Sequence, residues 1–154
     1  MTNVNNTGLP STDGYTLLLS ATVRASNVAA LRRQVRDLTS ACGMDADQVD
    51  GFAVAVNEVM TNAVRHGGGS GQIRLWCDGN VLCEVDDRGP GFDAGPHLER
   101  TERPVPSSRG GLGLWLARQT SDELVIESGP TGTTVSVSAH LSASPQPKTQ
   151  GMAG

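Results

Sequence analysis

Lysine is almost missing from this chain of 154 residues, and its scarcity excludes several chemistries. The one lysine, Lys148, lies near the C-terminal end. The body of the chain therefore offers neither the lysine of a phosphate-binding P-loop nor the strand lysine of a eukaryotic-type protein kinase. A Schiff-base lysine is excluded from the same region. In the body of the chain, a positively charged contact to a phosphate would therefore come from arginine.

Cysteine and aromatic residues are also few. The three cysteines, Cys42, Cys77 and Cys83, are scattered and have neither CxxC spacing nor the density of a disulfide framework, which predicts reduced thiols and a cytoplasmic protein. Two Trp, two Phe and one Tyr offer few stacking platforms, and a formal net charge of -4 provides no basic field for a phosphate backbone. We expect no direct contact with nucleic acid.

Long apolar runs are missing as well. No segment approaches the roughly 20 apolar residues of a membrane span, and the first residues lack the basic start and apolar run of a signal peptide. The sequence predicts no membrane association and one domain at residues 15–141. The polar segments 1–14 and 142–154 are expected to be disordered.

The first expected element is a strand at 15–23 that alternates between a buried and an exposed face. Its buried face is expected to carry Leu17, Leu19, Ala21 and Val23. Ser26 or Asn27 can cap the helix predicted at 28–42.

The remaining elements complete an α+β pattern. They are a helix from Asp45 or Asp47 to the run HGGGSG at 66–71, a hairpin of strands at 72–78 and 81–87, a helix at 112–120, and a hairpin of strands at 123–128 and 133–139. This order predicts a two-layer sandwich, with helices on one face of a mixed, mostly antiparallel sheet. The Gly- and Pro-rich stretch between the hairpins indicates a lid, and we expect residues 93–109 to respond to a nucleotide.

Three polar residues share one stripe of the second helix. At about 100° per residue, Asn62 lies about 40° from Glu58, and Arg65 lies about 20° to its other side. A solvated helix face is the commoner explanation of an isolated pair at this spacing. The functional interpretation makes Glu58 a base, and gives Asn62 an amide oxygen suited to Mg²⁺ beside triphosphate oxygens.

The strand that ends in Asp87 is followed by glycines. Because Gly89 and Gly91 have no Cβ, a ligand edge can approach the carboxylate closely. Asp and Gly are also ordinary turn formers, so the segment alone is compatible with a simple acidic turn.

A second glycine cluster opens the helix at 112–120. Arg109, Gly111 and Gly113 lie at its start, where free N–H groups and the positive end of the helix dipole suit a phosphate. A flexible hinge is the alternative explanation. The dinucleotide-binding pattern G-x-G-x-x-G is absent.

In this order, the motifs resemble those of the GHKL ATPases. NEVMTNAVRHG at 57–67 resembles the N box, DDRGPGF the G1 box, RGGLGL the G2 box, and the segment 132–135 the final box. The resemblance covers roughly residues 15–140, and the chain is most similar to the bacterial anti-sigma-factor serine/threonine kinases. The resemblance implies a Bergerat-type ATP-binding fold.

The same resemblance implies a site for ATP and Mg²⁺. In it, Glu58 is the catalytic base, Asn62 the metal ligand and Asp87 the acceptor of the adenine amino group. Further nucleotide contacts are expected from Arg65, Gly89, Gly91, Arg109, Gly111, Gly113 and either Thr133 or Thr134.

The function implied by the resemblance is an anti-sigma factor with kinase activity. Its partners would be a sigma factor and an anti-sigma-factor antagonist, and the family favours a homodimer. Two alternatives stay open: a nucleotide-dependent inhibitor that binds its partner without phosphorylating it, and an orphan histidine-kinase catalytic domain.

Overall fold

In the computed structural model, residues 12–89 and 111–141 are described, apart from the side chains of residues 111–114. The elements along the chain are β1 (Thr16–Arg24), α1 (Val28–Ala41), α2 (Ala46–His66), β2 (Ser70–Cys77), β3 (Asn80–Asp87), α4 (Gly111–Gln119), β4 (Glu123–Gly129) and β5 (Gly132–His140). Each lies where periodicity predicts an element of its type. The expected lid at 93–109 lies outside the described residues, as do Gly91 and Arg109.

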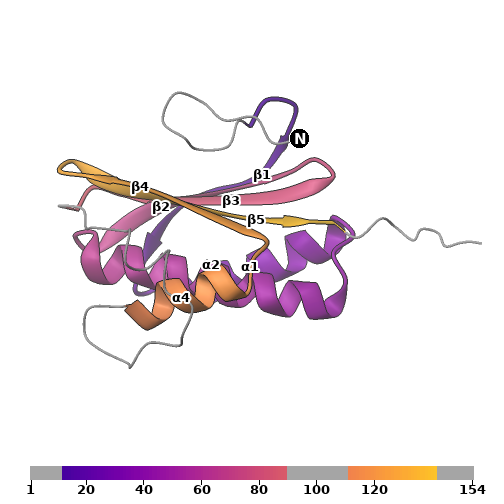
Figure 1. Cartoon of the computed structure of the whole chain (residues 1–154), viewed down its shortest axis with the longest axis horizontal. Coiled ribbons are helices and arrows are strands. Elements are labelled where there is room, and N and C mark those ends of the chain that lie inside the picture. Colours follow the sequence, from indigo (N-terminus) through magenta and orange to yellow (C-terminus); the bar gives the residue numbers. More distant parts are fainter. Residues whose placement is uncertain (1–11, 90–110, 142–154) are drawn as a thin grey trace, which may run out of the picture.

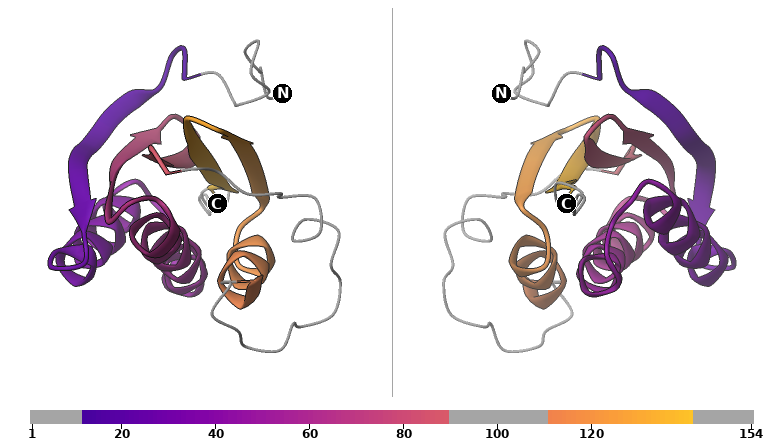
Figure 2. Two further views of the ribbon diagram at one scale, coloured as in Figure 1. Left: turned by 90° about the vertical axis from the view of Figure 1, so that its left-hand side faces the viewer. Right: turned by 90° about the vertical axis from the view of Figure 1, so that its right-hand side faces the viewer.

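The strands form one sheet in the order β1-β2-β3-β5-β4. All pairings of the described strands are antiparallel, including the hairpins β2–β3 and β4–β5. The three described helices lie together on one face of the sheet (Figures 1 and 2). The predicted two-layer α+β sandwich is therefore confirmed, and its described part contains no parallel pair.

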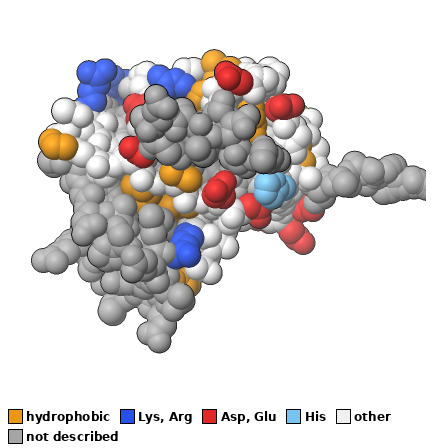
Figure 3. Space-filling view, turned by 45° about the horizontal axis from the view of Figure 1, so that its top comes forward, with side chains coloured by type: hydrophobic (Ala, Val, Ile, Leu, Met, Phe, Trp, Pro, Cys, Tyr) orange, Lys and Arg blue, Asp and Glu red, His pale blue; other side chains and the backbone are white. Residues whose placement is uncertain are grey.

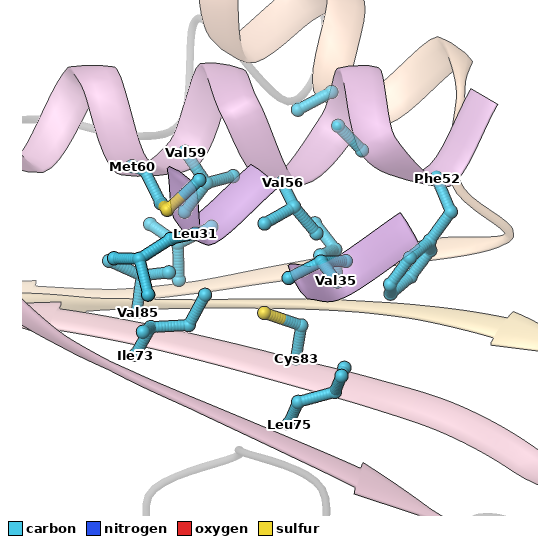
Figure 4. Close-up of a cluster of buried hydrophobic side chains, with 14 of the residues drawn as sticks. Leu31, Val35, Phe52, Val56, Val59, Met60, Ile73, Leu75, Cys83 and Val85 are labelled. Carbon is cyan, nitrogen blue, oxygen red and sulfur yellow. The ribbon is translucent and has the colours of Figure 1, made fainter. Parts of the chain in front are cut away.

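Helix α2 is the centre of the helix layer. It contacts α1, α4, β1, β2, β3 and β5. Figure 4 shows Val56, Val59 and Met60 pointing from α2 toward the sheet, where they belong to one buried cluster with Ile73, Cys83 and Val85. The helix starts as predicted, because the N-cap Asp45 accepts a hydrogen bond from the Gln48 backbone N–H at 2.8 Å. Its N-terminal end is thus fixed by a side chain, and its sheet face by burial.

The first strand departs from its predicted pattern at Leu17, which is 50% exposed. The register with β2 shifts between Leu17 and Leu19, so that Leu17 opposes Trp76 whereas Leu19 opposes the buried Leu75. A bulge inserts one extra residue, and the residues before it move to the other face of the sheet. The prediction that Leu17 faces the helices is therefore wrong.

The start of α1 also differs from the expectation in one detail. Asn27 is the N-cap residue, but its side chain makes no capping hydrogen bond to the helix. Instead, Oδ1 accepts from the Arg24 backbone N–H at 2.7 Å, and Nδ2 donates to the Thr22 carbonyl oxygen at 2.8 Å. The amide therefore closes the turn between β1 and α1, and the predicted side-chain cap is wrong.

The face of the sheet opposite the helices carries charged and polar side chains. Arg74 on β2 and Asp86 on β3 form an ion pair there at 2.9 Å. Acidic and basic side chains are interspersed over the surface in Figure 3, which is tilted toward this face. Among the residues that the structure describes, no helix is both long and apolar enough to cross a membrane.

Candidate functional site

The end of β3 meets the end of α2 at Asp87. Gly67 is the C-cap residue of α2, and a Cβ built on it would lie 2.5 Å from the Cβ of Asp87 and closer still to its Cγ. Gly132, the first residue of β5, is as tightly packed, because a Cβ there would overlap the carbonyl oxygen of Asp87. Carbon atoms in contact are ordinarily about 3.5–4.0 Å apart. Only glycine at these two positions lets helix and strand enclose Asp87.

Gly89 supports the same carboxylate through the backbone. Its N–H donates to Oδ1 of Asp87 at 2.9 Å. A Cβ on Gly89 would lie 2.7 Å from the Cα of Gly67 and from the carbonyl oxygen of His66. Gly89 thus packs against the end of α2 and holds one oxygen of Asp87, which leaves Oδ2 to accept from a ligand.

The sheet register distinguishes Thr133 from Thr134, either of which the sequence offered as a nucleotide contact. Thr133 opposes Asp87, whereas Thr134 opposes Asp86. Opposed residues share a face, so Thr133 lies with Asp87 on the helix side and Thr134 lies on the other side. Thr133 is 4% exposed, and its hydroxyl shares a 2.8 Å hydrogen bond with the Ser128 hydroxyl. Ser128 was not predicted; its place opposite Thr133 in the last hairpin is the signal that indicates it.

The two consecutive acidic residues at the end of β3 have different surroundings. Asp86 pairs with Arg74 on the face away from the helices. Nearby, burial raises the pKa of Glu84, while Arg74 lowers it and Asp86 raises it further. Only Asp87 of the two lies on the helix face, next to the glycines. It is the residue of this pair that can meet a ligand held by α2.

Two hollows flank this end of β3, and both include residues 86–88. One has a volume of about 340 Å³ and reaches Gly67 and Gly71. The other has a volume of about 440 Å³ and is lined by Ser128 and Thr133. The surface is therefore recessed on both sides of Asp87.

Glu58, Asn62 and Arg65 lie along one flank of α2. Gly51, two turns before Glu58, identifies this flank, because a Cβ on Gly51 would lie 3.4 Å from the Thr120 carbonyl oxygen at the end of α4. Glu58 and Asn62 are half-buried, and Arg65 is exposed. The predicted stripe therefore lies on the α4 side of the helix.

The glycines of the second cluster lie in the first turn of α4. This helix lies beside α2 and runs antiparallel to it (Figure 1), with its C-terminal end at Gly51. Its N-terminal end, with Gly111 and Gly113, is thus directed toward the later turns of α2, which carry Asn62. Free N–H groups and the positive dipole end favour an anion in this position.

The site residues thus belong to four elements. The structure brings Asp87, Gly89 and Thr133 together at the end of the sheet, and aligns Glu58 with Asn62 on α2. It places Thr134 on the opposite face. The close packing of Gly67 and Gly132 on Asp87 was missed, because glycine-rich sequence indicates permissive turns and not which backbones touch.

Comparison with known proteins identifies the family of this chain. The family profile described as the histidine kinase-like ATPase domain matches residues 20–139. Serine-protein kinase RsbW of Staphylococcus aureus is 27% identical over 131 residues, which cover 76% of this chain and 81% of that protein. Anti-sigma F factor of Bacillus licheniformis is 30% identical over 110 residues, which cover 64% of this chain and 73% of that protein.

A solved structure is similar as well. It contains the RsbU and RsbW domains of Rv1364c from Mycobacterium tuberculosis and superposes with a TM-score of 0.59 at 25% sequence identity. The match covers 80% of this chain and 31% of that longer chain. The predicted family resemblance is confirmed by these comparisons.

Proposed function

Because this chain belongs to the histidine kinase-like ATPase domain family, we propose that it is an ATP-binding anti-sigma regulator that phosphorylates a serine or threonine of an anti-sigma-factor antagonist. The relatives named serine-protein kinase RsbW and anti-sigma F factor support this proposal, since each match spans most of the relative. The proposed partners are this antagonist and a sigma factor, in the cytoplasm. A homodimer stays a prediction.

The position of Asp87 carries the proposal. An adenine ring has an exocyclic amino group that donates, and Oδ2 of Asp87 is an acceptor in a space that glycines keep open. The buried Thr133 hydroxyl lies on the same face. The buried Nε2 of His66, at the end of α2, has no hydrogen-bond partner among the described residues and can also meet a polar ligand atom. These groups offer hydrogen bonds to the polar edge of a base.

The phosphates would extend from this end of the sheet toward the space between α2 and α4. Gly111 and Gly113 would face them with backbone N–H groups, and Arg65 and Arg109 with positive charge. Asn62 would hold Mg²⁺ through its amide oxygen, and the bound ion would neutralise charge on the phosphates. No group of three or more His, Cys, Asp or Glu that could hold a metal occurs in the described residues, so Asn62 would share the ion with phosphate oxygens.

Glu58 is assigned to the transfer itself. It lies one helical turn from Asn62 on the same flank, so a substrate hydroxyl beside the phosphates can reach its carboxylate. Glu58 would accept the proton of that hydroxyl as its oxygen bonds to the γ-phosphorus, while the bond from this phosphorus to the β–γ bridging oxygen breaks and ADP leaves. Most of the remaining catalysis comes from positioning.

The test is phosphoryl transfer from labelled ATP, with Mg²⁺ and candidate antagonists, compared for wild type and Glu58→Gln. We expect ATP affinity within about twofold of wild type and a transfer rate lower by about 10²- to 10⁴-fold, as for loss of a general base. Glu84→Gln is a matched control, because Glu84 is also half-buried but lies on the far face of the sheet. It should leave the rate unchanged.

Three outcomes contradict the proposal in different ways. If Glu58→Gln transfers phosphate as fast as wild type, Glu58 is not the base. If wild type binds antagonist and sigma factor in the presence of ATP but transfers nothing, the protein is a nucleotide-dependent inhibitor without kinase activity. If the label is acid-labile and found on histidine, the domain is a histidine kinase.

A further inference from the structure

Asn57 lies between α1 and Glu58, and it contacts both. Arg32 on α1 donates from Nη1 to the amide oxygen Oδ1 of Asn57 at 3.0 Å. The amide nitrogen Nδ2 of Asn57 donates to Oε2 of Glu58 at 3.4 Å. All three side chains are half-buried. A continuous chain of donors and acceptors therefore links α1 to the carboxylate assigned to proton transfer.

We propose that Asn57 and Arg32 are positioning residues for the Glu58 carboxylate, an inference that rests on the proposed function above. Asn57 directs one oxygen of Glu58 toward the α1 side of α2, which leaves Oε1 for the substrate hydroxyl. Arg32 fixes which way the amide of Asn57 points. Neither residue touches the reacting atoms.

The order of donors and acceptors from Arg32 through Asn57 to Glu58 supports this role. A guanidinium group has donors only, so Arg32 turns the oxygen of the Asn57 amide toward α1. The same rotation turns the NH₂ group toward Glu58, which accepts in its ionised form. Without Arg32, the amide can flip and present its oxygen to the carboxylate, where two acceptors repel.

The 3.4 Å contact is longer than the usual range of about 2.7–3.2 Å, so it directs the Glu58 carboxylate without holding it tightly. The contact from Arg32 to Asn57 has an ordinary length at 3.0 Å, so the anchor of the chain is already formed.

Few other described charges face Glu58. On α1, Arg32 reaches Asn57, the residue before Glu58. On α2 itself, Arg65 lies two turns beyond Glu58 on the same stripe. On α4, the charged residue with a described side chain is Arg118, near the opposite end of that helix. A carboxylate introduced at position 57 would therefore place a like charge next to Glu58.

Asn57→Asp separates positioning from simple packing. It keeps an acceptor for Arg32, so the link between α1 and α2 survives, but it replaces the donor to Glu58 with a second carboxylate. We expect kcat for phosphoryl transfer to fall about 10- to 100-fold, KM for ATP to stay within about twofold, and the acid limb of the pH–rate profile to move up by about one unit. The melting temperature should be at least that of wild type.

Variants at two arginines provide the controls. Arg32→Lys keeps a donor and should restore most of the kcat that Arg32→Met loses. Arg36→Met removes the 2.6 Å ion pair with Asp50, another link between α1 and α2, but one that does not reach Glu58. It should leave kcat and the pH profile unchanged. If Arg36→Met reproduces the kcat and pH effects of Arg32→Met, then Arg32 and Asn57 act through the packing of α1 on α2, and the inference is wrong.

A titration that needs no turnover distinguishes this inference from the proposed function. The Glu58 carboxyl carbon is followed by NMR in ¹³C-labelled protein and identified by its loss in Glu58→Gln. We expect it to protonate at higher pH in Asn57→Asp than in wild type, whether or not any antagonist is phosphorylated. Identical titration curves in wild type, Asn57→Ala and Asn57→Asp would overturn the positioning role; a shifted curve without phosphoryl transfer would overturn only the kinase.

Discussion

Replacing Gly67 with alanine should separate α2 from β3 and weaken ATP binding. Gly67 has a φ of -106°, which alanine also adopts, so the backbone conformation by itself imposes no penalty. The added methyl group would lie 2.5 Å from the Cβ of Asp87 and would also overlap the Ala63 carbonyl oxygen within the helix. Because ordinary carbon contacts are about 3.5–4.0 Å, Asp87 must retreat by about 1 Å or more.

The size of the effect follows from that displacement. Overpacking of this kind typically costs about 1–3 kcal/mol, which corresponds to a fall of about 4–12 °C in the melting temperature of a domain of this size. A shift of about 1 Å at Asp87 would also break the proposed charge-assisted hydrogen bond to adenine, worth about 1.5–3 kcal/mol. We expect ATP affinity to fall at least about tenfold, measured by calorimetry at a temperature where the variant is folded.

Gly68→Ala is the matched control for the clash. Gly68 has a φ of +87°, and a Cβ there would meet nothing within 4 Å. Alanine at this position would adopt an unfavourable backbone conformation that costs about 1–2 kcal/mol, but its methyl group would contact no neighbouring residue. Stability should fall in both variants, whereas ATP affinity should fall only in Gly67→Ala. Equal ATP affinities for the two variants would refute the close packing of Gly67 on Asp87 as a condition for binding.

Three further predictions concern the same site and the thiols of Cys42 and Cys83. Asp87→Asn should weaken ATP binding by about 1–3 kcal/mol in calorimetry, and an unchanged affinity would remove the adenine assignment. Thr133→Val should weaken ATP binding while Thr134→Val should not, because only Thr133 shares the face of Asp87; the reverse order would place the nucleotide on the other face. Burial raises the pKa of Cys42 from 9.0 to about 12, and it raises the pKa of Cys83 as well, so the folded state keeps protons that the unfolded chain releases. The free energy of unfolding, measured by urea titration, should therefore fall as pH rises from about 9 toward 12. Cys42→Ser should make this dependence on pH less steep. A free energy of unfolding that rises over this range would contradict the prediction.

Local signals in the sequence predict most of the fold. Asp45 at the start of α2 is identifiable because its side chain caps the helix from a neighbouring position. The turn of the β2–β3 hairpin is identifiable from the pair Asp78-Gly79, since glycine readily adopts the positive φ that such turns require, and Gly79 has a φ of +65°. These features depend on residues close together in the chain, so periodicity and turn chemistry suffice.

Features that depend on pairing between distant segments were not predictable. The bulge that exposes Leu17 arises from the register between β1 and β2, which are separated by both α1 and α2. The choice of Thr133 over Thr134 depends in the same way on which of them opposes Asp87. A shift of one residue in either register would reverse the face, and no local pattern reports such a shift.

The candidate site residues could be proposed from residue type and spacing, but the contacts that support them could not. Helical spacing places Glu58 and Asn62 on one stripe, and the structure keeps that stripe on the flank of α2 beside α4. The contact of Asn57 with Arg32 joins residues from different helices. It can be seen only once α1 and α2 are packed together.

The alternation of polar and buried residues along α2 restricts how this stretch can evolve. Val59 and Met60, which are 1% and 0% exposed, lie in the chain between Glu58 and Asn62. Inserting or deleting one residue there would rotate everything on one side by about 100° relative to the other. The change would turn a polar group into the apolar core or an apolar side chain out of it. Lineages can therefore exchange side chains in this stretch, but the insertion or deletion of a single codon would disrupt both the core and the candidate site.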